Sequence, residues 1–254
     1  MDTVRVIPCL DIKDGRVVKG VHFVELKDAA DPVEAAQAYS AGGADEIAFL
    51  DITATIENRR TKFDVIKRVA AAIKVPLIAG GGITCSLDIE EAMAAGASAV
   101  TISSAAYRNP EMIEEAAKRF GSEHIIIAID ADVNESMPSQ REVYIDGGRT
   151  PTGEDAVEFA RRMIDVGAGQ ILPTSKAADG TKAGFDLQLT RQIADATKRP
   201  VIASGGAGTL EHFHQAVAEG HAKAVLAASV FHFGMFTVRQ VKEYLAARGV
   251  PVRL

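Results

Sequence analysis

Two aspartates at the ends of apolar segments are the first candidates for acid–base chemistry. Asp11 closes the segment 4–12, and Asp130 closes the segment 125–130. Two carboxyl groups that flank a bound substrate can act as general acid and general base, and partial desolvation raises a carboxyl pKa toward neutrality. A single aspartate at such a place more often caps a helix or pairs with a lysine. For two aspartates that face each other across one site, catalysis is the better interpretation.

Two glycine-rich segments have the composition of phosphate-binding loops. Glycine lets the backbone approach a ligand closely, and its amide groups can point at phosphate oxygens. Small and polar residues one strand later add hydroxyl donors. We predict two phosphate sites, one at Gly81, Gly82, Ser103 and Ser104, the other at Ser204, Gly205, Gly206, Ala228 and Ser229. A tight turn would explain one such segment, but two at matching places favour a substrate with a phosphate at each end.

Three further polar residues have two interpretations each. Asp51 ends another apolar segment and could contact substrate or only orient a neighbouring carboxyl group. Asp179, which precedes Gly180, could accept hydrogen bonds from substrate hydroxyls, or it could be an ordinary turn residue. Lys19 lies in the polar, glycine-flanked segment 13–20, which we predict to be a mobile loop that closes over substrate. The alternative is a solvated loop lysine.

These residues need a fold that gathers the ends of several strands. Eight near-continuous apolar runs are typical of parallel strands buried on both faces, and they cover 4–12, 46–52, 75–80, 99–104, 125–130, 170–175, 200–205 and 224–229. Segments with helical spacing, such as 31–43 and 154–167, separate them. We predict an α/β fold, a single (β/α)8 TIM barrel over residues 1–254, with its site at the carboxyl ends of the strands. An open doubly wound sheet is the alternative.

An internal repeat favours the barrel. Residues 31–34 (DPVE) match residues 155–158 (DAVE) at an offset of 155 − 31 = 124, and Gly81 matches Gly205 at the same offset. We therefore predict a twofold internal repeat that arose by duplication of a half-barrel. In such a barrel the first and fifth strands, which carry the two candidate catalytic aspartates, face each other.

Composition excludes several classes of function. The net charge of −6 does not favour binding to nucleic acid or to an anionic membrane. The two cysteines, Cys9 and Cys85, form no CxxC pair, and we find no long apolar stretch, so we expect a cytoplasmic protein. No metal-binding constellation, dinucleotide fingerprint or nucleophile elbow is present. We therefore expect neither a metal ion nor a cofactor.

Ordered motifs run along nearly the whole chain: IPCLDIKDGRVVKG (7–20), FLDITA (49–54), GGGI (80–83), AIDA (128–131), DGTKAGFD (179–186), ASGGAG (203–208) and LAASVFHF (226–233). In these motifs the sequence resembles the cyclase subunits of imidazole glycerol phosphate synthase, which act in histidine biosynthesis. The sister isomerase of that pathway shares a two-phosphate barrel but is less similar to this sequence.

The resemblance implies a lyase that takes ammonia from a glutaminase partner. The substrate is an aminoimidazole-carboxamide ribulosyl nucleotide with two phosphates, and the products are imidazole glycerol phosphate and aminoimidazole carboxamide ribotide. Asp11 and Asp130 match the family's catalytic aspartates, Asp179 matches a substrate-contacting aspartate, and Lys19 matches a loop lysine. The two glycine-rich regions match the family's two phosphate sites.

The resemblance also implies an ammonia entrance at the opposite end of the barrel, where the family has four charged residues. Arg5 and Glu46 are retained here, but Ala99 replaces the usual lysine and Gln170 the usual glutamate. The loop 173–178 also departs from the family pattern, and Ser103 stands where asparagine is expected. These changes put glutaminase docking or ammonia gating in doubt, while the chemistry at the carboxyl ends of the strands looks intact.

Three hypotheses follow. The first is the cyclase acting with a glutaminase. The second is a paralogous barrel enzyme on a related phosphosugar, either an aminoaldose isomerase or an ammonia-dependent cyclase without the usual glutaminase. The third is a non-catalytic phosphosugar-binding subunit, against which the retained Asp11 and Asp130 speak. The altered residues Ala99 and Gln170 are what separates the second from the first.

Overall fold

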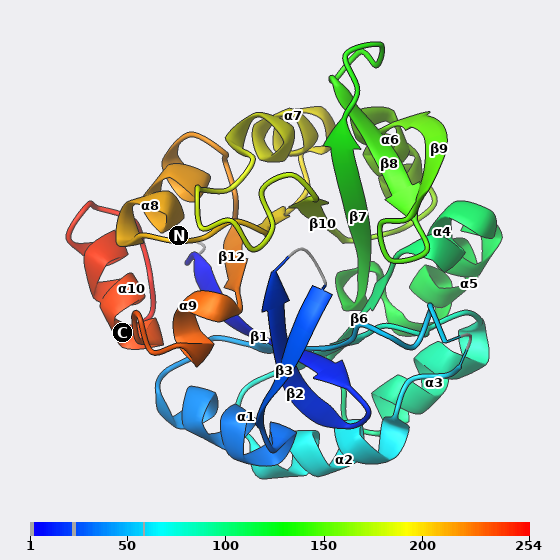
Figure 1. The fold of residues 1–254 in the computed structure, drawn as a ribbon. Coiled ribbons are helices and arrows are strands. Elements are labelled where there is room, and N and C mark those ends of the chain that lie inside the picture. Colours follow the sequence, from blue (N-terminus) through cyan, green and yellow to red (C-terminus); the bar gives the residue numbers. More distant parts are fainter. Residues whose placement is uncertain (1–2, 22–23, 58) are drawn as a thin grey trace.

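Eight parallel strands pair in a continuous ring in the computed structural model of the chain (Figure 1). The structure describes residues 3–21, 24–57 and 59–254, with the backbone alone for 19–21 and 24–30. The ring strands are β1 (Arg5–Lys13), β4 (Ile47–Asp51), β5 (Leu77–Gly80), β6 (Ala99–Ile102), β7 (Ile125–Val133), β10 (Gln170–Ser175), β11 (Ile202–Ala203) and β12 (Ala224–Ala227).

The pairing of these strands returns to its starting point. Parallel ladders join β1 to β4, β4 to β5, β5 to β6, β6 to β7, and β7 to β10. β10 meets β11 through single bridges, Ile171 with Val201 and Thr174 with Ser204. β11 pairs with β12, and β12 pairs with β1. The carboxyl ends of all eight strands therefore lie at one end of the ring.

Helices surround the ring on its outside (Figure 1). They are α1 (Pro32–Ala41), α2 (Phe63–Ala72), α3 (Ser86–Ala94), α4 (Ser104–Arg108), α5 (Pro110–Phe120), α6 (Ala156–Asp165), α7 (Leu187–Thr197), α8 (Leu210–Ala218), α9 (Ser229–His232) and α10 (Val238–Ala246), with a 3-10 turn, η1, at Ser122–His124. Asp31 caps α1 and Asp155 caps α6, each by accepting hydrogen bonds from the second and third following amides. No helix in the described ranges is long and apolar enough to cross a membrane.

Two antiparallel ribbons extend from the carboxyl ends of β1 and β7. The first consists of β2 (Arg16–Val21) and β3 (Val24–Ala30), the second of β8 (Arg141–Ile145) and β9 (Thr150–Asp155). The prediction of a loop over 13–20 is therefore wrong, because most of this segment is strand β2. Asp14 and Gly15 have φ values of 53° and 79°, which suit a two-residue hairpin turn. The Asp-Gly pair was the sequence signal for this hairpin. Lys19 lies on β2, but its side chain is outside the described part of the chain.

The core has an inner and an outer part because ring strands alternate their side chains. One buried apolar cluster includes a member from each of the eight ring strands, so it fills the interior of the ring: Ile7, Cys9, Ala48, Ile78, Ala99, Ile126, Leu172, Ile202, Ala224 and Leu226. The alternate residues, such as Leu10 and Phe49, pack outward under the helices. The interior is thus a packed plug, and the cavity at the carboxyl ends of the strands lies beyond it.

Candidate functional site

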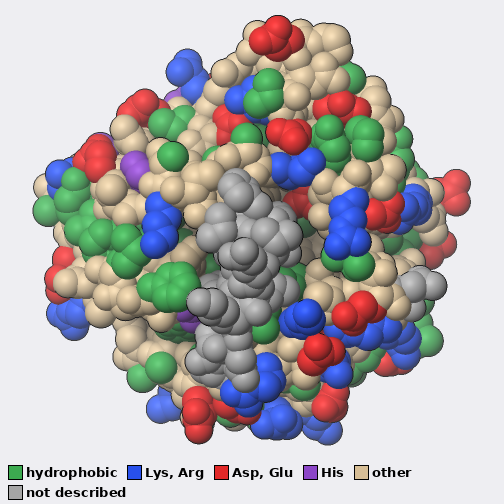
Figure 2. Space-filling view, viewed as in Figure 1, with side chains coloured by type: hydrophobic (Ala, Val, Ile, Leu, Met, Phe, Trp, Pro, Cys, Tyr) green, Lys and Arg blue, Asp and Glu red, His purple; other side chains and the backbone are tan. Residues whose placement is uncertain are grey.

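A cavity of about 860 Å³ opens at the carboxyl ends of the ring strands. Figure 2 shows this face of the molecule, where acidic and basic side chains surround the middle of the face. Fourteen of the residues predicted above line it: Asp11, Asp51, Gly81, Gly82, Ser103, Ser104, Asp130, Asp179, Gly180, Ser204, Gly205, Gly206, Ala228 and Ser229. The fold therefore gathers in one place the candidate acid–base residues and both candidate phosphate sites.

The two candidate catalytic aspartates enter this cavity from different strands. Asp11 lies on β1, and the thiol of Cys9 donates a hydrogen bond to its carboxylate over 3.2 Å. Asp130 lies on β7, where its neighbours in register are Thr174 of β10 and Tyr144 of β8. The sequence reasoning used Cys9 only as an indicator of compartment. Its alternation with Asp11, two residues apart on one face of a strand, was the signal for this contact.

Asp130 has an environment that favours its protonated form. The pKa of Asp130 is raised from 3.8 to about 6, mainly by burial and also by the negative charge of Asp179, while the charge of Lys176 acts in the opposite direction. A carboxyl group that titrates near pH 6 can both accept and release a proton under physiological conditions. This is the property that general acid–base catalysis requires.

The glycines of both candidate phosphate sites hold conformations that other residues rarely adopt. Gly81 and Gly82 have φ values of 86° and 69°, and Gly205 and Gly206 have 80° and 100°. The backbone also passes very close to its neighbours. A Cβ atom at Gly81 would lie 2.1 Å from the carbonyl oxygen of Asp51, and one at Gly206 would lie 2.1 Å from a carbonyl oxygen. Only glycine fits both requirements.

We expect Gly81→Ala to lower the free energy of unfolding by about 2 kcal/mol more than Gly43→Ala, because overpacking of that kind costs about 1–3 kcal/mol. Gly43 is the matched control, since its φ is 87° and nothing lies within 4 Å of a Cβ placed there. Urea denaturation of the two variants measures the difference. Equal losses in both would show that the contact with the Asp51 backbone relaxes at no cost.

Asp51 is held by an arginine that the sequence reasoning did not single out. Arg59 donates to both carboxylate oxygens of Asp51, over 2.6 and 2.7 Å, and it also donates to Glu57 and Thr53. The Asp51 side chain is fully buried, and this pairing holds the pKa of the Arg59 guanidinium above its ordinary value. These bonds tie Asp51 to the loop that follows β4. The sequence signal for this pairing was the cluster of charged residues at 57–60, in a loop that follows a strand ending in an aspartate.

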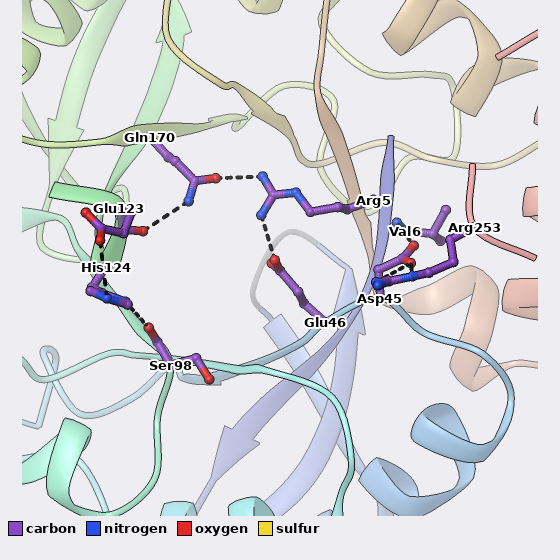
Figure 3. Close-up of polar contacts among 9 residues, drawn as sticks. All are labelled: Arg5, Val6, Asp45, Glu46, Ser98, Glu123, His124, Gln170 and Arg253. Carbon is purple, nitrogen blue, oxygen red and sulfur yellow. Dashed lines mark hydrogen bonds and ion pairs between the residues drawn. The ribbon is translucent and has the colours of Figure 1, made fainter. Parts of the chain in front are cut away.

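The opposite end of the ring carries a smaller polar cluster (Figure 3). Arg5, at the start of β1, donates to Glu46 over 2.7 Å and to the side-chain oxygen of Gln170 over 2.6 Å. Gln170 in turn donates to the backbone carbonyl of Glu123 over 3.3 Å. The fold thus joins three of the four predicted entrance residues in one chain of hydrogen bonds. The fourth, Ala99, is part of the packed interior cluster and is 7% exposed.

Comparison with known protein families gives a match over most of the chain. A family model described as "Histidine biosynthesis protein" matches residues 5–237, which is most of the sequence. Members of this family are enzymes of the isomerase or cyclase type, and the family implies phosphorylated substrates, in agreement with a cavity that has two glycine-rich sites. From the fold, the cavity and this match, the chain belongs to the histidine biosynthesis protein family.

Proposed function

We propose that the chain is a cyclase of the lyase class. It would convert an aminoimidazole-carboxamide ribulosyl nucleotide with two phosphates, together with ammonia, into imidazole glycerol phosphate and aminoimidazole carboxamide ribotide. The observation that carries the proposal is the single cavity at the strand ends. It gathers the two candidate catalytic aspartates, from β1 and β7, and the two glycine-rich sites, which follow β5–β6 and β11–β12.

Each part of this cavity has a role in the proposed reaction. The β5–β6 site (Gly81, Gly82, Ser103 and Ser104) and the β11–β12 site (Ser204, Gly205, Gly206, Ala228 and Ser229) hold the two phosphates. The substrate then lies with its reacting centre between Asp11 and Asp130. Addition of ammonia to the ribulosyl carbonyl requires proton removal from the incoming nitrogen and proton delivery to the oxygen, which leaves as water. Ring closure then breaks the C–N bond to the ribotide, whose leaving nitrogen takes up a proton. The two carboxyl groups supply these proton transfers. Asp179 and Asp51 border the same space.

Matched details in the two halves support the proposed twofold repeat, and with it a single barrel domain. Asp31 and Asp155, which are 155 − 31 = 124 residues apart, cap their helices with the same bonds and nearly the same backbone angles. Gly81 and Gly205, at the same offset, have φ values of 86° and 80°. A hairpin follows both β1 and β7. A duplicated half-barrel accounts for two phosphate sites on one cavity.

The source of ammonia separates the glutaminase-coupled cyclase from the ammonia-dependent cyclase of the second hypothesis. Arg5 joins Glu46 and Gln170 across the end of the ring, and the interior above them is filled by apolar side chains. The neutral side chains of Ala99 and Gln170 leave Arg5 and Glu46 as the charged pair among the four predicted entrance residues. These observations favour the ammonia-dependent form of the cyclase, without the usual glutaminase, as the second candidate function.

One assay tests the cyclase and separates it from the second candidate. We expect turnover of the two-phosphate nucleotide with ammonium chloride at pH 8, followed by the appearance of imidazole glycerol phosphate. Stimulation by a cyclase-type glutaminase with glutamine would support the coupled form, and no stimulation would support the ammonia-dependent form. Absence of product with ammonium, together with isomerisation of an aminoaldose with two phosphates, would contradict the cyclase and assign the chain to the isomerase type.

A further inference from the structure

The basic residues of the cavity are distributed unequally between its two sides. Among the described residues that line it, those with a positive charge are Lys13, Arg59, Arg108 and Arg149. None of them belongs to the β11–β12 site. Arg108 is the last residue of α4, the short helix that begins at Ser104 of the β5–β6 site. The two candidate phosphate sites therefore differ in charge.

The hydrogen bonds of Arg59 and Arg108 show which of these two arginines has donors left for a ligand. Arg59 commits all five of its N–H groups, to Asp51, Glu57, Thr53 and the carbonyl of Arg60. Arg108 donates from Nη2 to both carboxylate oxygens of Asp146, over 2.7 and 2.8 Å. Within the described part of the chain, its Nε and Nη1 groups make no hydrogen bond. Arg59 is thus structural, while Arg108, which also lines the cavity, has three N–H donors without a partner among the described residues.

Asp146 connects Arg108 to the β5–β6 site. It lies in the turn of the β8–β9 ribbon with a φ of 58°, and its backbone N–H donates to the hydroxyl oxygen of Ser104 over 2.9 Å. Because Ser104 accepts that bond, its own hydroxyl hydrogen can donate to a ligand. The Asp146 carboxylate meanwhile fixes the guanidinium of Arg108. Ser104 and Arg108 are therefore placed as donors by one and the same turn.

We propose that Arg108 is a phosphate-binding residue of the β5–β6 site. It holds one phosphate of the substrate through Nε and Nη1, while Asp146 keeps Nη2 in place. The β11–β12 site binds the other phosphate mainly through amide and hydroxyl donors. Charge-assisted bonds are stronger than neutral ones, so the β5–β6 site binds its phosphate more tightly and with the greater dependence on salt. This inference rests on the two-phosphate function proposed above.

Calorimetric titration of the full chain with inorganic phosphate tests the assignment. We expect two bound phosphates in the wild type. Arg108→Gln should weaken the tighter of the two by about 10- to 100-fold, as loss of a charge-assisted bond predicts, and leave the other unchanged. Arg119→Gln is the matched control, because Arg119 is 53% exposed like Arg108 and pairs with one carboxylate, on the outer helix α5. It should bind both phosphates as the wild type does.

Asp146→Asn tests whether Arg108 binds phosphate or only holds the turn of the β8–β9 ribbon through its ion pair. It breaks the same ion pair from the other side but keeps the backbone bond to Ser104. If Arg108 binds phosphate, this variant should bind at least as tightly as the wild type, because a nearby negative charge is gone. Equal weakening in Asp146→Asn and Arg108→Gln would overturn the proposal, and so would unchanged binding in Arg108→Gln. A wild type that binds two phosphates with Arg108→Gln unaffected would leave the cyclase proposal standing, whereas a wild type that binds none would remove both.

Discussion

Asp130→Asn is expected to lower turnover by about 10²-fold or more, since that is the usual loss when a general acid or base is removed. The amide has nearly the shape of the carboxyl group, so substrate should still bind with a similar KM. Steady-state kinetics with ammonium as the nitrogen source measures both quantities.

Asp132→Asn is the matched control. It removes one negative charge from the same strand, but Asp132 pairs with Lys176 over 3.2 Å and does not line the cavity. Near-normal turnover in Asp130→Asn would remove Asp130 from the proposed mechanism.

The pH dependence of the same variants is a second test of Asp130. Its pKa is raised to about 6 by burial and by the charge of Asp179. The wild-type rate profile should therefore show an apparent pKa near 6, and Asp130→Asn should lack it. A profile that keeps this inflection in the variant would assign it to another group.

The raised pKa of Asp130 also predicts how stability changes with pH. Between 3.8 and about 6 the folded protein binds more protons at this site than the unfolded chain does. Stability contributed by the protonated form is therefore lost as pH rises through that window. The free energy of unfolding of Asp130→Asn minus that of the wild type should therefore be larger at pH 8 than at pH 5, as measured by urea denaturation. An identical difference at the two pH values would contradict the raised pKa.

Arg59→Met should destabilise the fold by about 3 kcal/mol, at the lower end of the range for removing one partner of a buried ion pair. The change leaves the carboxylate of Asp51, whose side chain is fully buried, without its two bonds from the guanidinium. The lower end applies because the Arg59 side chain itself is 26% exposed. Urea denaturation at pH 7 measures the loss.

A control and a double variant separate the charge effect from lost packing. Arg119→Met breaks an exposed pair with Glu90 and should cost less than about 1 kcal/mol. Adding Asp51→Asn to Arg59→Met should recover part of the stability, because the unpaired charge is then gone. If Arg59→Met were no more harmful than Arg119→Met, the pair would contribute little, and the view of Arg59 as a structural residue would fail.

The sequence determined the order of the strands and the residues at their ends. Near-continuous apolar runs indicate buried parallel strands, and each of the eight predicted runs overlaps a ring strand, although the run at 200–205 contains only the two-residue β11. Because parallel strands bring their carboxyl ends to one edge, the positions of Asp11, Asp130 and the glycines at those ends were enough to predict a shared site. The segment 13–20 was misread because polarity outweighed its Asp-Gly turn, although Val17 and Val18 are buried.

Only the tertiary structure decided which charges meet, because partners from different loops have no fixed spacing in the sequence. Arg108 and Asp146 are 38 residues apart, and Arg5 and Gln170 are 165 apart, yet each pair is within hydrogen-bonding distance. The pKa of Asp130 likewise depends on burial and on Asp179, which lies on another loop. Apolar periodicity is a local property of the chain and can be read along it. Electrostatic pairing depends on distances in space, and those exist only once the ring has closed.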